Sequence, residues 1–393
     1  MSHGTRRRAR TLQLAAAASL LLVMTGCSGG LGGGGDEAEA SGPIKFGMLA
    51  PFSGSESAFG AYMENGAQLA VDEINADGGV LGREIELVVE DDACDATTAV
   101  AGANKLVTDG IVASVGGYCS GATLPTLPIF DEAGIPMVIP AANANSLVEE
   151  GLPGVFLING TGTQQAAAAV QYAEQIGATS VAAIDDATAY SADLAASFVE
   201  QAGEAGLEIA FEATVTPGEN DYSSVATQLA DAQPQLVYWT GYYQEGGLIA
   251  RQSSDAGFGG AFLVGDGSVD AKFAEIAGAG YTDNVVGTFT QTPDMIEGAD
   301  DWIAAYTELA GAAPGPYSTQ SYDAVRVMAQ AIEDAGSTEF DAVVEALEAL
   351  DGFETFAGPL TFTENHTLSG GGFVIVSIDP ATGAFVLKDD LQG

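Results

Sequence analysis

Residues Gly117-Tyr118-Cys119-Ser120-Gly121 place a cysteine between two glycines in the pattern G-x-C-x-G. With serine in place of the cysteine, this pattern is typical of the sharp turn that carries the nucleophile of many hydrolases. His366 lies far downstream with carboxylates in between, so the order along the chain also suits a catalytic triad. A hydrolase with Cys119 as its nucleophile is therefore the first hypothesis that the sequence raises.

Other residues argue against an enzyme. Beyond the N-terminal segment the chain has one histidine, His366, and the turn formers around it in TENHTLSG indicate an exposed turn between two strands. The sequence contains no G-K-[ST] phosphate loop, H-E-x-x-H motif or Cys/His cluster, so it predicts no ATP hydrolysis, metal site or cofactor. Cys94 and Cys119 are the only cysteines besides Cys27, and in an exported protein such a pair most simply forms a disulfide.

The N-terminal residues are typical of an exported lipoprotein. Four arginines precede an uncharged run at residues 11–26, which is too short and too rich in alanine for a membrane span. The run ends in MTGC, which resembles the lipobox of bacterial lipoproteins; secretion with a nearby cleavage site is the alternative. The sequence predicts a signal peptide over residues 1–27, a lipid anchor on Cys27 at the outer face of the cytoplasmic membrane, and a flexible tether over residues 28–43.

The chain is strongly acidic, with 54 acidic residues, 11 basic residues and a formal net charge of −43. A field of this sign repels nucleic acid and anionic membrane surfaces, so the composition excludes nucleic acid as a partner. The acidic residues are interpreted as a hydrated surface rather than as an acidic functional site.

A repeating pattern of strands and helices positions these residues. Short apolar runs at residues 44–50, 84–91 and 111–117 alternate with amphipathic stretches, and the alternation restarts after residue 160. Such alternation predicts parallel sheets with helices on both faces, and the number of units favours two doubly wound α/β lobes. Ligands of these sheets bind on the loops that follow the carboxyl ends of the strands.

Several segments occur in a fixed order: LAPFSG, GAQLAVDEINADGGVLGREIELVVEDDACD, GYCSGAT, GIPMVIPAAN and YWTGYYQEGGLIARQ. Together they resemble the branched-chain amino-acid-binding proteins of ABC transporters, over residues 44–393. The resemblance implies the periplasmic-binding-protein type I fold, in which two lobes joined by crossing hinge strands close on a ligand. By analogy, residues 44–161 and 289–371 form one lobe, and residues 162–288 and 372–393 form the other.

The resemblance also implies a site for an amino-acid zwitterion. Ser120, Ala141 and Asn143 match positions around the α-carboxylate of the ligand, and their hydroxyl, backbone and amide groups are suitable hydrogen-bonding partners. Asp266 matches the position whose carboxylate pairs with the α-ammonium. The other matched positions near the ligand are aromatic: Phe59, Tyr118, Tyr190, Tyr242 and Tyr317.

Three of these positions depart from the family's pattern. Phe59 stands where tyrosine or tryptophan is common, Asn143 where threonine is typical, and Asp266 where the branched-chain binders have glutamate. The preference for a ligand side chain is therefore open. The family also has a disulfide at the positions of Cys94 and Cys119, which would prevent Cys119 from acting as a nucleophile.

Sequence and resemblance together predict an extracytoplasmic lipoprotein that acts as a monomer and is not an enzyme. It would capture a branched-chain or related amino acid between its lobes and deliver it to the permease of an ABC transporter. A ligand sensor for a membrane receptor is the alternative, because the same fold serves both roles. A small amide, a urea-like compound or an aromatic carboxylate is an alternative ligand.

Overall fold

A computed structural model describes residues 42–370, 372–389 and 391. The expected signal peptide, the lipidated Cys27 and the tether up to residue 41 lie outside the described residues. Among the residues that are described, no helix has the length and apolar character needed to cross a membrane.

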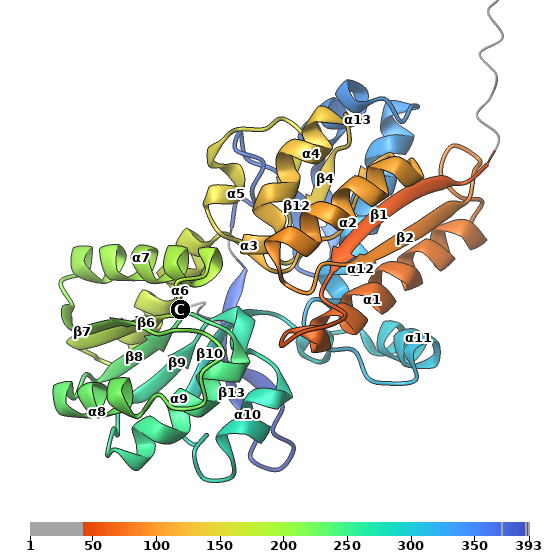
Figure 1. Ribbon diagram of the computed structural model, residues 1–393. Helices are drawn as coiled ribbons and strands as arrows, with labels where there is room; N and C mark the ends of the chain where they lie inside the picture. Colours follow the sequence, from red (N-terminus) through yellow and green to blue (C-terminus); the bar gives the residue numbers. More distant parts are fainter. Residues whose placement is uncertain (1–41, 371, 390, 392–393) are drawn as a thin grey trace, which may run out of the picture. The chain divides into compact units, whose positions relative to one another are not determined.

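The first sheet has five parallel strands in the order β2-β1-β3-β4-β5 (Figure 1). The strands are β1 (Ile44–Ala50), β2 (Ile85–Asp91), β3 (Ala113–Ser114), β4 (Met137–Ile139) and β5 (Val155–Leu157). The apolar runs at residues 44–50 and 84–91 thus form strands as expected, whereas the run at residues 111–117 forms only two residues of strand. β1 is buried along almost its whole length, which explains why all its residues except Lys45 are apolar rather than alternating.

Helices from two separate parts of the chain belong to the first lobe. The N-terminal part supplies α1 (Ser57–Ala76), α2 (Ala96–Asp109), α3 (Ser120–Thr123), the 3-10 turn η1 (Leu124–Thr126), α4 (Leu127–Glu132) and α5 (Ser146–Glu149). The later part supplies η3 (Pro293–Met295), α11 (Asp300–Ala310), α12 (Ser318–Ala335) and α13 (Phe340–Glu348). α1 and α12 lie side by side (Figure 1), and a Cβ on Gly66 would lie 2.0 Å from the carbonyl oxygen of Ser318. The glycine is needed for this close approach.

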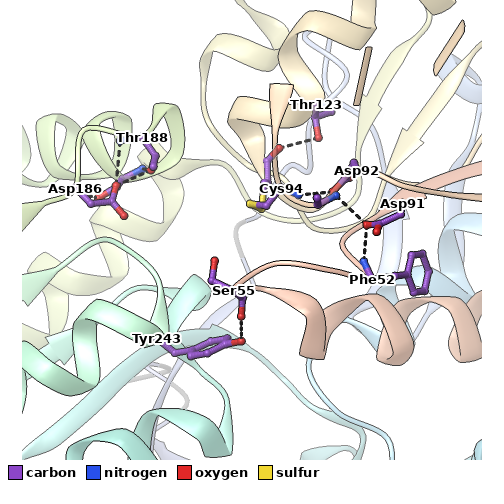
Figure 2. The surroundings of a disulfide bond; sticks show 12 residues. Phe52, Ser55, Asp91, Asp92, Cys94, Thr123, Asp186, Thr188 and Tyr243 are labelled. Carbon is purple, nitrogen blue, oxygen red and sulfur yellow. Dashed lines mark hydrogen bonds between the residues drawn. A yellow bond between two sulfur atoms is a disulfide. The ribbon is translucent and has the colours of Figure 1, made fainter. Parts of the chain in front are cut away.

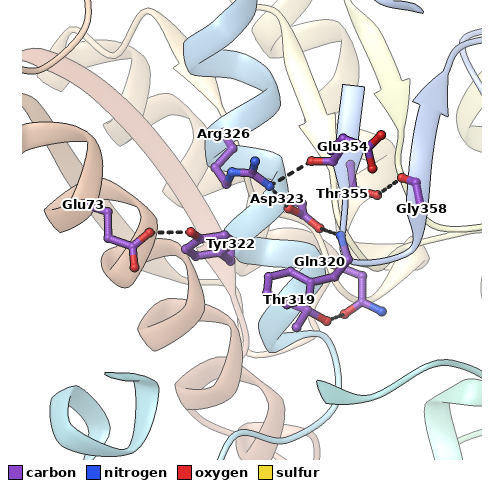
Figure 3. Close-up of polar contacts among 10 residues, drawn as sticks. Glu73, Thr319, Gln320, Tyr322, Asp323, Arg326, Glu354, Thr355 and Gly358 are labelled. Atoms are coloured by element: carbon purple, nitrogen blue, oxygen red, sulfur yellow. Dashed lines mark hydrogen bonds and ion pairs between the residues drawn. The ribbon is translucent and has the colours of Figure 1, made fainter. Parts of the chain in front are cut away.

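Polar contacts fasten α12 to its neighbours (Figure 3). The Tyr322 hydroxyl donates to Glu73 on α1. Asp323 pairs with Arg326 at 2.7 Å and accepts a 2.8 Å hydrogen bond from the backbone N–H of Phe356, just after β11 (Asp351–Thr355). β11 pairs with β12 (Gly358–Thr361) as a small antiparallel sheet. These contacts attach the later segment of the chain to the first lobe.

The second sheet has seven strands in the order β14-β13-β10-β9-β8-β6-β7. Its parallel strands are β6 (Ser180–Asp185), β7 (Glu208–Thr214), β8 (Leu236–Trp239), β9 (Ala261–Val264) and β10 (Val285–Thr290). Its helices are α6 (Gly162–Gln175), α7 (Ala189–Glu204), α8 (Ser223–Ala232), α9 (Tyr243–Asp255) and α10 (Ala271–Ala277). β13 (Phe373–Ile378) and β14 (Phe385–Asp389) add an antiparallel edge, so this sheet is mixed rather than wholly parallel.

The chain passes between the two sheets after β5, after β10 and after β12. At the first crossing Thr161 and Gln164 form a capping box, which fixes the start of α6. The Gln164 side chain also donates a 3.0 Å hydrogen bond to the carbonyl of Leu368, in the third crossing. The crossings are therefore bonded to one another where the lobes join, and the expected arrangement of two α/β lobes with crossing strands is confirmed.

Candidate ligand-binding site

Loops from both sheets meet at the carboxyl ends of their strands. Residues from the first sheet are Ser120, which opens α3, Ala141 and Asn143 after β4, and Asn159 after β5. Residues from the second sheet are Tyr190 on α7, Tyr242 just before α9, and Asp266, which opens the 3-10 turn η2 (Asp266–Ser268) after β9. This is the place where open α/β sheets hold ligands.

Seven of the nine residues expected at the site line one small cavity. They are Tyr118, Ala141, Asn143, Tyr190, Tyr242, Asp266 and Tyr317, and Gly267 completes the lining. The cavity holds about 10 Å³, roughly the space for one water molecule. An amino acid is much larger, so the lobes must separate to admit one.

Ser120 and Phe59 lie beside the cavity rather than on its wall. The Ser120 hydroxyl accepts a 3.3 Å hydrogen bond from the backbone N–H of Ala144. Phe59 stacks on Tyr118 with ring centroids 4.4 Å apart. Ser120 therefore fixes the loop after β4, and Phe59 supports an aromatic wall.

Asp266 is the centre of the hydrogen bonds in this cavity. Its side chain is 2% exposed, and its two carboxylate oxygens accept from both lobes. The donors are the hydroxyls of Tyr190 and Tyr317, each at 2.6 Å, the backbone N–H of Gly267 at 3.2 Å, and the amides of Asn143 at 3.2 Å and Asn159 at 3.5 Å. The carboxylate is thus oriented by neutral donors.

No basic side chain compensates the charge of Asp266. The ion pairs among the described residues are Lys105–Glu90, Arg326–Asp323 and His366–Glu348. Burial raises the pKa of Asp266, and the hydrogen bonds from Tyr190 and Tyr317 oppose that rise. Burial and the Asp266 charge raise the pKa of both tyrosines well above the usual value, so both hydroxyls stay protonated as donors. The arrangement is suited to receive one positive charge.

Asn143 lines the cavity, and its amide is hydrogen-bonded to two other residues of the site. Its amide donates to Gln165 at 3.0 Å and to Asp266 at 3.2 Å, so it contacts the carboxylate expected to hold the ammonium. The expected contact with the α-carboxylate of a ligand stays a prediction. The Ala141 carbonyl accepts a 2.7 Å hydrogen bond from the Asn159 amide.

Sequence reasoning missed Gln165 and Asn159. Gln165 is fully buried on α6, and its amide donates to the Thr288 hydroxyl at 2.9 Å. Asn159 lies just beyond the carboxyl end of β5, and polar residues at such strand ends are candidates for a ligand site. That position was the available signal for Asn159. Gln165 is one of several glutamines in α6, so its residue type carried no such signal.

Aromatic rings form the rest of the wall. The Tyr118 ring lies 5.6 Å from Tyr317 and 6.2 Å from Tyr242, and Tyr242 lies 5.3 Å from Tyr190. Phe289 on β10 packs against Tyr317 at 5.1 Å. These rings offer apolar faces to a ligand and several hydroxyls at their edges.

Cys94 and Cys119 form a disulfide, with their Cα atoms 5.4 Å apart (Figure 2). The bond ties the loop after β2 to the start of α3. Asp92 accepts a 2.8 Å hydrogen bond from the backbone N–H of Cys94 and holds the same loop. A sulfur in a disulfide is not a thiolate, so Cys119 is not a nucleophile.

His366 lies apart from the cysteines. Its ring stacks on Phe156 at 4.1 Å and is within 3.1 Å of Glu348. The expectation of an exposed turn is wrong for the side chain, which is 14% exposed, because the ring packs against the first lobe. Among the described residues, no group of three or more His, Cys, Asp or Glu side chains could hold a metal ion.

Comparisons with known proteins find relatives over most of the chain. The family model described as "Periplasmic binding protein" matches residues 43–383. The chain is 36% identical over 335 residues to the Leu/Ile/Val-binding protein BraC3 of Rhizobium johnstonii, covering 84% of this chain and 90% of that relative. It is 32% identical over 340 residues to the leucine-, isoleucine-, valine-, threonine- and alanine-binding protein of Pseudomonas aeruginosa, covering 86% and 90%.

Solved structures show the same fold. The leucine-binding protein LivK of Thermotoga maritima has a TM-score of 0.81 and 28% identity, covering 88% of this chain and 97% of its own. The branched-chain amino acid transporter substrate-binding protein LivJ of Streptococcus pneumoniae, solved with isoleucine, has a TM-score of 0.78 and 28% identity, covering 88% and 100%.

Proposed function

Because this chain belongs to the periplasmic binding protein family, we propose that it captures a branched-chain or related amino acid between its two lobes and delivers it to an ABC transporter permease. Members of this family are binding proteins of extracytoplasmic compartments rather than enzymes. One observation carries the proposal: the Asp266 carboxylate is buried between the lobes, is held by neutral donors and pairs with no basic side chain in the part of the chain that the structure describes.

The α-ammonium of the ligand would bind at Asp266. A buried carboxylate pays a desolvation cost, and a cation with matched geometry offsets it. The α-carboxylate would bind near the Ser120 hydroxyl and the backbone of the loop that contains Ala141 and Asn143. The aromatic residues Phe59, Tyr118, Tyr190, Tyr242 and Tyr317 would enclose the rest of the ligand. Both charges of the ligand need partners in the site, because micromolar binding provides only about 8 kcal/mol in total.

Closure of the lobes would couple binding to delivery. Asp266 follows β9 of the second sheet, whereas Tyr317 precedes α12 of the first lobe, and the two are hydrogen-bonded. We assign residues 44–161 and 289–371 to the first lobe, and residues 162–288 and 372–393 to the second. Opening about the three crossings breaks the Tyr317–Asp266 bond and exposes both faces of the site.

The location of the protein follows from the family, and its attachment is part of the proposal. A lipid on Cys27 would hold a monomeric protein at the outer face of the cytoplasmic membrane, with the glycine-rich segment before residue 44 as a tether. Incorporation of radiolabelled palmitate into the wild-type protein, and its loss in Cys27→Ala, would support this anchor. Equal labelling of both proteins would contradict it.

Calorimetry with a panel of amino acids tests the binding function. We expect Asp266→Ala to abolish binding of every amino acid that the wild type binds, with an unchanged circular dichroism spectrum. Asp255→Ala, an exposed acidic residue at the end of α9, is the matched control and should bind as the wild type does. Undiminished affinity in Asp266→Ala would show that the ammonium binds elsewhere.

A further inference from the structure

Two buried carboxylates from different lobes face the same region, and each has one oxygen without a hydrogen-bond partner. Glu56, just before α1, is 2% exposed, and Asp186, just after β6, is 1% exposed. One oxygen of each, Oε2 of Glu56 and Oδ2 of Asp186, has no hydrogen-bond partner. The buried hydroxyl of Tyr118 also lacks one. Buried polar atoms are normally satisfied, and an unpaired buried carboxylate is costly.

Neither carboxylate is explained by local structure alone. Glu56 occupies the N-cap position of α1, yet its side chain makes no capping hydrogen bond. Asp186 uses Oδ1 to accept from the backbone N–H of Thr188 at 3.0 Å and from its hydroxyl at 2.7 Å, which leaves Oδ2 free. Figure 2 shows the Asp186–Thr188 contact on one lobe opposite the disulfide loop of the other.

Contacts of neighbouring residues bring these groups to Tyr242, which lines the cavity. The Tyr243 hydroxyl donates to the carbonyl of Ser55, so the residue after Tyr242 is bonded to the residue before Glu56 (Figure 2). On the other side, a Cβ on Gly241 would lie 2.8 Å from Oδ2 of Asp186. Glu56 and Asp186 therefore adjoin the same edge of the cavity.

The surrounding charges are almost all negative. Burial, followed by repulsion from Glu245, Asp186 and Asp270, raises the pKa of Glu56 to about 8, and the Ser55 side chain opposes the rise. Glu245 and Asp270 already accept backbone hydrogen bonds, from Gly218 at 2.8 Å and Lys272 at 2.9 Å.

The remaining titratable groups facing Glu56 are tyrosines and one lysine. Burial and the Glu56 charge raise the pKa of Tyr118, Tyr242 and Tyr243, so these hydroxyls are neutral. Burial raises the pKa of Asp270, and the Lys272 ammonium opposes that rise. The same ammonium lies 5.9 Å from the centroid of the Tyr243 ring, so it interacts with groups other than Glu56. Among the described residues, no basic side chain pairs with Glu56 or Asp186.

We propose that Glu56, Asp186 and the Tyr118 hydroxyl form the subsite for the ligand side chain, and that this subsite receives an ammonium or guanidinium group. The inference rests on the proposed function, in which Asp266 holds the α-ammonium. The preferred ligands are then amino acids with a second cationic group, of the ornithine, lysine and arginine type. The methylene chain packs on the faces of Tyr118 and Tyr242, which also attract the cation.

Ornithine and norleucine provide a direct test, because they have the same number of heavy atoms and differ by a terminal ammonium in place of a methyl group. By calorimetry at pH 7 we expect the wild type to bind ornithine at least 10-fold more tightly than norleucine. The double variant Glu56→Gln/Asp186→Asn should lose this preference. Glu245→Gln, a buried acid on α9 that is already hydrogen-bonded, is the matched control and should keep it.

Proton release gives a second readout. A cation stabilises the ionised form of Glu56, so ornithine binding at pH 7 should release a proton, and norleucine binding should not. Calorimetry in two buffers of different ionisation enthalpy measures this difference, which Glu56→Gln should abolish.

The possible results distinguish the cationic subsite from the proposed amino-acid binding on which it rests. Tight binding of norleucine or leucine, with weak binding of ornithine, lysine and arginine, overturns the cationic subsite and leaves the proposed function standing. It would mean that ordered water satisfies Glu56, Asp186 and Tyr118. Binding of no amino acid overturns both.

Discussion

The Tyr317 hydroxyl donates a 2.6 Å hydrogen bond to the Asp266 carboxylate, and the two residues belong to different lobes. Tyr317 has a φ of 63°, in the left-handed region that a bulky residue rarely adopts. Its ring is held by Phe289 at 5.1 Å and Phe59 at 6.0 Å. Packing against Phe289 and Phe59 thus maintains an unfavourable backbone conformation that directs this hydroxyl at Asp266.

Tyr317→Phe removes the hydroxyl and keeps the ring. We expect amino-acid affinity to fall by about 10-fold, because a buried hydrogen bond to a charged group contributes about 1.5–3 kcal/mol. Calorimetry measures the change. Tyr306→Phe, whose hydroxyl donates at 3.2 Å to the carbonyl of Tyr62 away from the site, is the control and should bind normally. Equal affinities for the two variants would mean that Tyr317 acts only in packing.

Ser120→Ala should have a smaller effect than any change at Asp266. The hydroxyl accepts from the Ala144 backbone and is one of several groups expected near the ligand carboxylate, so backbone donors remain after its removal. We expect a loss of about 1 kcal/mol, or roughly 5-fold in affinity. A titration of the same amino acid into both proteins checks this, and a loss as large as that of Asp266→Ala would show that Ser120 is a principal partner of the ligand.

The sequence predicted much of the fold because its signals are local and repeated. The alternation of strand and helix patterns predicts two parallel α/β lobes wherever the spacing of the apolar residues is clear. β3 came out shorter than its apolar run because residues 115–117 are buried in the loop that leads to the disulfide. The antiparallel edge formed by β13 and β14 depends on where the chain returns after its third crossing, which no local pattern reports.

The residues of the candidate site were predicted from the family resemblance. It implied Asp266 and the tyrosines, and the structure brings them to one cavity. The contacts of Asn143 were not predictable, because an amide can orient toward a ligand or toward Gln165 and Asp266 with equal ease. Glu56 was missed because a glutamate before a helix is normally an exposed cap, and only the tertiary structure buries it.

Removing the disulfide should lower stability without abolishing binding. The bridge spans 25 residues of sequence, and the chain-entropy model gives a loop of this size about 3 kcal/mol. We expect Cys94→Ser/Cys119→Ser to lower the thermal midpoint by about 5 °C in calorimetry. Cys94→Ser alone should lower it similarly and expose one reactive thiol. Reactive thiols at both positions in the unreduced wild type would contradict the bridge.

Because of Glu56, the free energy of unfolding should decrease as pH rises. Its pKa is raised from 4.5 to about 8 in the folded protein, so folding favours its protonated form. The stabilising contribution is complete below pH 4.5, decreases as pH rises, and is lost above about pH 8. Asp92 and Asp323, whose pKa values burial raises to about 6, act in the same direction over a lower range.

Glu56→Gln isolates this contribution, because glutamine stays neutral at every pH. Between pH 5 and pH 9 the wild type should lose about 4 kcal/mol more unfolding free energy than the variant, since each pKa unit corresponds to 1.36 kcal/mol. Urea unfolding at pH 5, 7 and 9 measures both curves. Asp72→Asn, at an exposed position on the same helix, is the control and should follow the wild type. If the Glu56→Gln curve also follows the wild type, Glu56 is ionised and solvated in the folded protein.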